Sequence, residues 1–306
     1  MRRPPRKKGK EDLRVLGARK KSIVSRSSNQ RDGLRKLNGQ RKMPFVKIDK
    51  AVQHYVAEGG KEKPALVFSN SLGSDLRIWD SVASRLAGHF QTIRYDKRGH
   101  GLSDSTEPPY TIDDLARDLV GLLDALEIRQ AVVCGISVGG LIAQCLALNH
   151  PQRVRALVLC DTGARIGSTE SWDQRIATVQ TGGLQPLEAP SMERWFSQTF
   201  RERCPADVRG YSNMLLRTTV AGYLGTCCAL RDADFTPDAA RIKQPTLVLC
   251  GEQDIATPPE LGQSLARLIP HARFSLIQKA AHLPCIEQPE AVADKMMEFF
   301  REVQIG

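Results

Sequence analysis

The chain has 306 residues, which is enough for one large α/β domain or two small ones. It is 41% hydrophobic and 25% charged, an ordinary composition for a globular protein. Its net charge of +10 is concentrated: residues 1–42 hold sixteen of the 44 Lys and Arg residues and three of the 34 Asp and Glu residues, so residues 43–306 carry 28 basic and 31 acidic side chains. This mildly acidic part is not typical of a nucleic-acid-binding domain, and no window approaches the roughly 18 apolar residues of a membrane span.

Residues 1–42 form a basic segment with few apolar side chains and no sustained period, and we expect it to be disordered. Three interpretations stay open: an overlong N-terminus with the true start at Met43, an arm that contacts nucleic acid or anionic surfaces without specificity, and an organelle-targeting peptide. The segment has no apolar region of the kind that a secretory signal needs. We therefore divide the chain into this extension and a folded domain, 43–306.

Short apolar runs alternate with helical patterns from residue 43 onward, beginning with a predicted antiparallel hairpin at 45–48 and 52–56. Further strands are expected at 65–68, 92–95, 131–134, 154–160, 246–251 and 273–277, and helices at 78–86, 112–126, 137–148, 260–268 and 290–303. From about 163 to 234 the pattern has helical patches and no strand. The sequence therefore predicts an α/β fold: an eight-stranded, mostly parallel sheet flanked by helices, with a helical cap inserted after the sixth strand, over the edge where such sheets bind ligands.

The chain contains eight cysteines, none of them in a C-x-x-C pair. Three of them end apolar runs, where a small buried side chain fits. We expect free thiols in a reducing compartment, hence a cytoplasmic protein, with neither a disulfide framework nor a metal site.

The stretch VVCGISVGG carries the first chemical signal, because an apolar strand leads through Gly135-Ile136-Ser137-Val138-Gly139 into an apolar helix. It fits the nucleophile elbow, G-x-S-x-G, in which a tight turn pushes the serine hydroxyl clear of the sheet. Side chains two residues to either side would collide, so glycine fits at both positions. Ser137 is the candidate nucleophile; the alternative is a glycine-rich turn that only packs a helix on a strand.

A serine hydroxyl needs a base, and the base needs an acid; the order in this class of sheet is Ser, acid, His. Asp254 lies in the loop after the strand 246–251, and His282 lies in the loop between the last strand and the last helix. Both would reach the edge where Ser137 lies. Asp161, directly after another strand, is a competing acid, and the alternative role of Asp254 is to cap the following helix.

The oxyanion that forms on the substrate needs two N–H donors. The Val138 amide, at the start of a helix, is one candidate. The second is expected from the loop 69–73 (SNSLG); we predict the Leu72 amide, with the Ser71 amide as the alternative. If this loop takes no part in catalysis, it is a connector between a strand and a helix.

From residue 43 to the end, these motifs resemble the α/β-hydrolase family: the elbow GISVGG, the acid loop GEQDIATP and the histidine loop AAHLPCIEQPE. Narrower segments resemble the 3-oxoadipate enol-lactonases within that family, namely LVFSNSLGSDLRIWD, RYDKRGHGLSD, DTGARIG and CCALRDADF. The basic extension has no counterpart in that pattern. The resemblance implies hydrolysis of a small five-membered enol-lactone to 3-oxoadipate, in the β-ketoadipate pathway of aromatic degradation, with no metal or cofactor.

The substrate that this resemblance implies carries a carboxylate, so a cation is expected in the pocket. Arg165 is the first candidate, because it follows the strand that precedes the cap, and Arg217 and Arg231 are further candidates. Trp172 and Trp195 are tentative pocket walls. For each arginine the alternative is a solvated surface residue, and for each tryptophan it is the core of the cap.

Other functions stay open beside the lactonase. A carboxylesterase, a C–C bond hydrolase and a cofactor-free perhydrolase would use the same triad, and a scaffold without catalysis would bind a partner instead. The expected partner is a small anionic lactone, with no specific nucleic acid and no membrane.

Overall fold

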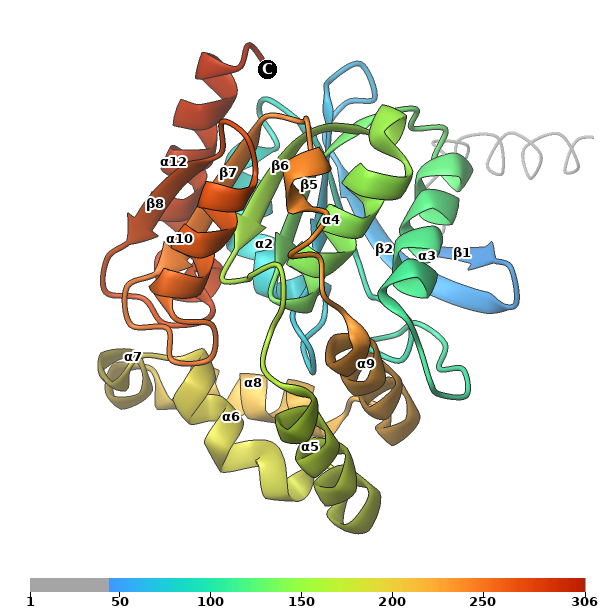
Figure 1. The fold of residues 1–306 in the computed structure, drawn as a ribbon, viewed down its shortest axis with the longest axis vertical. Coiled ribbons are helices and arrows are strands. Elements are labelled where there is room, and N and C mark those ends of the chain that lie inside the picture. The colour runs from blue at the N-terminus through green and yellow to red at the C-terminus, as the bar shows by residue number, and fades with distance from the viewer. Residues whose placement is uncertain (1–43, 306) are drawn as a thin grey trace, which may run out of the picture. The chain divides into compact units, whose positions relative to one another are not determined.

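The structure, a computed structural model, describes residues 44–305. The disorder expected for residues 1–42, and the interpretations of that segment, lie outside the described residues. The predicted hairpin is formed by β1 (Phe45–Ile48) and β2 (Ala51–Glu58), which pair antiparallel. These two strands lie at one edge of the sheet (Figure 1).

Six further strands complete one sheet in the order β1-β2-β4-β3-β5-β6-β7-β8. They are β3 (Ala65–Ser69), β4 (Gln91–Tyr95), β5 (Ala131–Ile136), β6 (Val154–Cys160), β7 (Thr246–Gly251) and β8 (Arg273–Ile277). β2 pairs antiparallel with β4, and the remaining neighbours from β4 to β8 pair parallel. Strands β3 to β7 are almost entirely buried, in keeping with the mainly apolar sequences of β3, β5, β6 and β7; β4, QTIRY, is buried although it contains polar residues.

Helices cover both faces of this sheet. They are α2 (Asp80–Leu86), α3 (Ile112–Ala125), α4 (Val138–Asn149), α10 (Pro259–Leu268), α11 (Pro284–Glu287) and α12 (Pro289–Glu302). In Figure 1, α4 and α10 lie in front of the sheet and α2 lies behind it. α3 packs beside α4, and α12 packs beside α2. A capping box between Thr111 and Asp114 starts α3, whose apolar residues at three and four spacing face the core.

The segment between β6 and β7 forms five α-helices. They are α5 (Thr169–Gly182), α6 (Glu188–Trp195), α7 (Gln198–Arg203), α8 (Pro205–Leu216) and α9 (Val220–Asp232). Figure 1 shows them gathered at one end of the sheet, and they agree with the helical insertion expected after the sixth strand. We call this segment the cap. The helices of residues 44–305 include none that is long and apolar enough to cross a membrane.

Short 3₁₀ turns join these elements, and one of them changes a predicted boundary. They are η1 (Leu76–Trp79), η2 (Pro151–Arg153), η3 (Gln185–Leu187) and η4 (Ala239–Arg241). The helix expected at 78–86 is in fact η1 followed by α2. Asp75 caps η1 by accepting from the Arg77 amide, so the helical segment begins two residues earlier than its apolar pattern indicates.

Candidate active site

Ser137 lies at the turn between β5 and α4, with a φ of 56° and a ψ of −120°. Such a conformation costs a non-glycine residue about 1–3 kcal/mol and persists only where the surroundings hold it. Here β6 and the loop after it hold the turn. The Ser137 N–H donates to the Cys160 carbonyl at 3.0 Å, and the Thr162 hydroxyl donates to the Ser137 carbonyl at 2.8 Å. The turn presents the Ser137 side chain to a cavity at the carboxyl edge of the sheet.

The glycines on either side of Ser137 allow a close approach of backbone to backbone. A Cβ at Gly135 would lie 2.1 Å from the Gly139 carbonyl oxygen, and a Cβ at Gly139 would lie 2.3 Å from the Ser69 carbonyl oxygen. No side-chain rotation relieves either contact, because both partners are backbone atoms. The strand and the helix meet this closely only with glycine at these two positions.

We expect Gly135→Ala to lower the free energy of unfolding by about 1–3 kcal/mol, because the added methyl group overpacks the turn. Gly210→Ala is the matched control: a Cβ there meets no atom within 4 Å, and alanine in the interior of α8 gains about 0.5–1 kcal/mol. Urea unfolding followed by far-ultraviolet circular dichroism measures both. A Gly135→Ala variant as stable as the Gly210→Ala variant would contradict the packing argument.

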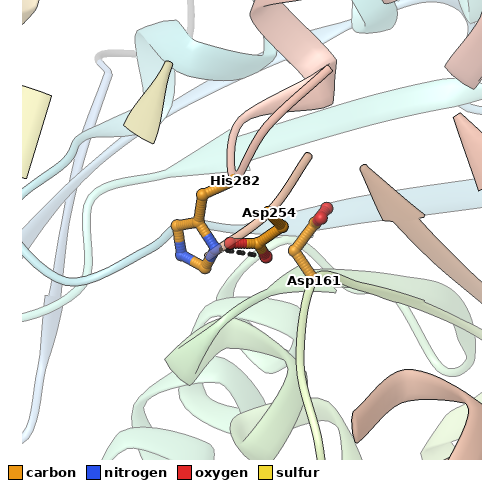
Figure 2. Close-up of side chains that lie close together, drawn as sticks. All are labelled: Asp161, Asp254 and His282. Atoms are coloured by element: carbon orange, nitrogen blue, oxygen red, sulfur yellow. Dashed lines mark hydrogen bonds and ion pairs between the residues drawn. The ribbon is translucent and has the colours of Figure 1, made fainter. Parts of the chain in front are cut away.

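Asp254 and His282 form the hydrogen-bonded pair drawn in Figure 2. His282 Nδ1 lies 2.9 Å from Asp254 Oδ2, and both side chains are almost fully buried. The Asp254 carboxylate also accepts from the amides of Ala256 at 2.7 Å and Thr257 at 3.1 Å, and from the Thr257 hydroxyl at 2.6 Å. Burial alone raises the pKa of Asp254, but the attraction of His282 and these hydrogen bonds outweigh it, so the pKa lies below its usual value. An ionised Asp254 fixes the orientation of the His282 ring.

Asp161, the competing acid, lies beside Asp254 in Figure 2 but takes another partner. Its Oδ1 accepts from the Gly251 amide at 2.7 Å, and its Oδ2 has no hydrogen-bond partner within residues 44–305. Burial, followed by the negative charge of Asp254, raises the pKa of Asp161 well above its usual value. The geometry therefore favours Asp254 over Asp161 as the acid that orients His282.

The same three side chains bring one potential metal-ligating atom each to within 4.8 Å of one another: Asp161, Asp254 and His282. Asp254 already accepts four hydrogen bonds from protein groups, and His282 Nδ1 is one of those donors. Because Asp254 and His282 are already bonded to each other and to Thr257, these two side chains fit a hydrogen-bonded dyad better than a metal centre.

His282 Nε2, the atom that would take the proton of a nucleophile, faces the cavity that Ser137 lines. Among residues 44–305, its hydrogen-bond partner is the Ser71 hydroxyl at 3.5 Å, and none joins it to Ser137. Catalytic hydrogen bonds are often long without substrate and tighten when it binds. Sequence reasoning missed two side chains here. The Ser71 hydroxyl contacts His282 Nε2, and the Thr257 hydroxyl contacts both Asp254 and His282. Thr257, three residues after Asp254, was detectable as a partner in a local turn.

One predicted oxyanion donor, Val138, belongs to the elbow, and the other, Leu72, belongs to the loop after β3. Val138 is the first residue of α4, so its N–H is among the four that have no partner inside the helix. Leu72 lines the cavity beside Ser137, and its N–H has no acceptor among the groups of residues 44–305. Both amides therefore remain available to a developing negative charge.

The cavity itself lies between the carboxyl edge of the sheet and the cap, and has a volume of about 200 Å³. Trp172 and Trp195 both line it, and both are also buried in the hydrophobic core, so the two alternatives for these side chains stay open. Two further lining residues carry a positive charge, Arg175 on α5 and Arg194 on α6. Arg175 lies 5.2 Å over the Trp172 ring, and neither arginine forms an ion pair with a carboxylate of residues 44–305. Burial, together with the positive charge of Arg175, lowers the pKa of Arg194.

The arginines singled out from the sequence lie elsewhere. Arg165 is exposed, is not among the side chains that line the cavity, and lies 3.6 Å from Asp234. Arg217 is exposed at the end of α8. Arg231 pairs with Asp173 and Asp232 at the surface. A helical spacing could have indicated Arg175, because it lies one turn after Trp172; no local signal indicates Arg194.

Comparison with known proteins gives the family. Residues 64–289 match the family model for the alpha/beta hydrolase fold. The chain is 39% identical over 238 residues to 3-oxoadipate enol-lactonase 2 of Acinetobacter baylyi, an alignment that covers 78% of this chain and 89% of that protein. It is 35% identical over 246 residues to enol-lactonase 1 of the same organism, over 80% and 92% of the two chains. The solved structure of the enol-lactonase from Burkholderia xenovorans matches with a TM-score of 0.82 and 37% identity, over 84% of this chain and 100% of that one.

The sheet order, the covering helices and the elbow between β5 and α4 define an α/β hydrolase. The chain belongs to the α/β-hydrolase family. Its similarity to the enol-lactonases identifies it as an enzyme of the carboxylic ester hydrolase class.

Proposed function

We propose that this enzyme hydrolyses 3-oxoadipate enol-lactone to 3-oxoadipate, in the β-ketoadipate pathway of aromatic degradation. One observation carries the proposal: a small cavity is lined by Ser137 and His282 and also by two arginines, Arg175 and Arg194, that form no ion pair with a carboxylate of residues 44–305. A volume of about 200 Å³ is small for a ligand pocket, where about 300–1,000 Å³ is usual for drug-sized molecules. The names of the relatives support the same substrate.

The proposed mechanism uses a covalent acyl-enzyme. His282 takes the proton of Ser137, whose oxygen attacks the lactone carbonyl, while the Leu72 and Val138 amides stabilise the oxyanion. The ring C–O bond then breaks and releases an enolate, a better leaving group than an alkoxide, which takes a proton and becomes the ketone. His282 next takes a proton from water as the water oxygen attacks the ester of Ser137; the bond between Ser137 Oγ and the acyl carbon breaks, His282 returns the proton to Ser137, and 3-oxoadipate leaves.

The two cavity arginines provide the charge that this substrate needs. A carboxylate that contacts Arg175 and Arg194 would gain charge-assisted hydrogen bonds without displacing a protein carboxylate, since Arg194 Nε donates to the Pro190 carbonyl and Arg175 lies over the Trp172 ring. The lactone ring would lie against Trp172 and Trp195, within reach of Ser137. The eight cysteines form no disulfide, which fits the cytoplasmic location that we propose for the enzyme.

The test of this function is the ring opening of freshly generated 3-oxoadipate enol-lactone, followed by ultraviolet absorbance, beside p-nitrophenyl acetate as a generic ester. We expect fast lactone turnover and slow acetate cleavage. Slow lactone turnover with fast acetate cleavage would instead identify a carboxylesterase. Activity found only with ring-cleavage products would identify a C–C bond hydrolase. Activity found only with hydrogen peroxide and a carboxylic acid would identify a perhydrolase.

We expect Arg175→Met and Arg194→Met each to lower kcat/KM for the lactone by about 10–100-fold, because a hydrogen bond to a charged group contributes about 1.5–3 kcal/mol. Hydrolysis of p-nitrophenyl acetate, which has no carboxylate, should change less than about threefold. Arg165→Met is the matched control, since that side chain lies at the surface beside Asp234. A lactone defect confined to Arg165→Met would move the carboxylate site to the entrance of the cap.

A further inference from the structure

A buried lysine contacts the loop of the oxyanion-hole donors, and the mechanism above does not use it. Lys97 lies just past β4 and is 1% exposed. Its Nζ donates to the carbonyl oxygens of Ser71 at 2.6 Å and Ser74 at 3.4 Å. Burying an amine costs free energy unless the amine is hydrogen-bonded. The contacts to these two carbonyls therefore offset the cost of burying Lys97.

The Ser71 carbonyl and the Leu72 N–H are the two ends of one peptide group. That peptide is trans, so its C=O and N–H lie in one plane and point in opposite directions. The C=O points to Lys97 Nζ, and the N–H therefore points away from it. A strong donor on the carbonyl also polarises the peptide, which makes the Leu72 N–H a stronger donor in turn.

We propose that Lys97 is a positioning residue for the oxyanion hole, which holds the Ser71 carbonyl and thereby sets the direction and strength of the Leu72 N–H donor. This inference rests on the proposed function, in which Leu72 stabilises the oxyanion. The Ser71 carbonyl also accepts from the hydroxyl and the amide of Ser74, at 2.9 and 3.3 Å. Those donors belong to the same loop and move with it, whereas Lys97 comes from the end of a buried central strand.

Other residues near the end of β4 hold the same loop. The Asn70 side chain donates to the Tyr95 carbonyl at 3.0 Å, and the Leu76 amide donates to Asp96 at 2.8 Å. The Gly73 amide donates to His100 Nε2 at 3.0 Å. Burial, followed by the positive charge of Lys97, lowers the pKa of His100 well below its usual value, and the neutral ring is what lets Nε2 accept. Residues at and after the end of β4 thus fix the position of the loop that follows β3 and contains Leu72.

The contacts of Lys97 Nζ with the Ser71 and Ser74 carbonyls can form whether the amine is charged or neutral. Burial lowers the pKa of Lys97 to about 7, against the attraction of Asp96 and Asp75. A neutral amine loses one of its three N–H donors and keeps two, one for each carbonyl that it contacts.

The test compares Lys97→Met with Lys63→Met. Lys63 is a matched control, because its Nζ also donates to two backbone carbonyls, of Ala87 and Gly88, both at 3.0 Å and away from the cavity. A serine-reactive phosphonate counts the competent sites of each preparation, so that loss of folded protein does not count as loss of catalysis. Rates per site are then measured with p-nitrophenyl acetate and with the lactone.

We expect Lys97→Met to lower kcat per site by about 10–100-fold with KM changed less than about threefold, because the affected donor acts in the transition state; removing such a donor outright typically costs about 10²–10³. Lys63→Met should match wild type. An unchanged kcat per site in Lys97→Met overturns the proposal, as does a change in KM alone. If Lys97→Met yields no titratable protein, Lys97→Gln is judged by the same criterion.

Failure of the Lys97 proposal can be distinguished from failure of the proposed function. A wrong substrate assignment appears as slow lactone turnover by the wild type, and the Lys97 effect is then still read with p-nitrophenyl acetate, whose hydrolysis needs the same oxyanion hole. An oxyanion hole that does not use Lys97 appears as fast lactone turnover that Lys97→Met leaves intact.

Discussion

Ser137→Ala is expected to lower kcat for the lactone by about 10⁵–10⁶-fold, because removing the nucleophile of a triad costs about as much as removing the whole triad. The elbow holds Ser137 by its own backbone contacts to Cys160 and Thr162, so the variant should keep the fold. Absorbance of the lactone at enzyme concentrations high enough to detect the residual rate measures the loss, and unfolding in urea confirms that the protein is intact.

Ser71→Ala is the control for that experiment, since the Ser71 hydroxyl is the one that contacts His282 Nε2 in this structure. Rapid mixing of wild type with p-nitrophenyl acetate should release a burst of nitrophenol equal to the enzyme concentration, as an acyl-enzyme requires. The burst should persist in Ser71→Ala and vanish in Ser137→Ala. The reverse pattern would make Ser71 the nucleophile and remove the elbow from the mechanism.

Asp254→Asn is expected to lower kcat by about 10⁴-fold, the loss typical of a triad whose acid no longer fixes the histidine tautomer. The asparagine would keep the shape of the side chain but would have an amide where Asp254 accepts from His282 and from the Thr257 hydroxyl. Steady-state kinetics with the lactone and with p-nitrophenyl acetate should show the same loss, because the dyad serves both substrates.

Asp161→Asn is the matched control for this second experiment. Burial and the negative charge of Asp254 raise the pKa of Asp161, and its carboxyl does not contact His282, so an amide of the same size should change kcat less than about tenfold. Asparagine can still accept from the Gly251 amide, the contact that Asp161 makes. A loss of about 10⁴-fold in Asp161→Asn with an active Asp254→Asn would transfer the acid role to Asp161.

Much of the fold was predictable because each strand and helix is encoded by a local pattern. The predicted bounds of β6, β7 and β8 agree with the structure: β6 and β7 are mainly apolar runs, and β8 alternates polar and apolar residues over RFSL. The hairpin of β1 and β2 was predictable from its alternation. Bounds shifted where a side chain outside the apolar pattern decided them, as Asp75 does at the start of η1.

The candidate triad was predictable for a related reason. Ser137, Asp254 and His282 each follow a parallel strand, and parallel strands end at one edge, so their order along the chain already places them together. The sequence placed Asp254 ahead of Asp161 but left both open, because both follow neighbouring strands; the structure adds that Asp254 contacts the His282 ring, whereas Asp161 accepts from the Gly251 backbone amide.

The sequence by itself determined the sheet, the elbow and the loops that follow the strands, because these depend on residues close together in the chain. Only the tertiary structure decided which cations face the cavity and what holds the oxyanion loop. Arg175 and Arg194 belong to different cap helices, and Lys97 and Ser71 lie on different strand-to-helix connections. Such pairs meet through the packing of whole elements, and that packing sums many weak contacts that no local pattern records.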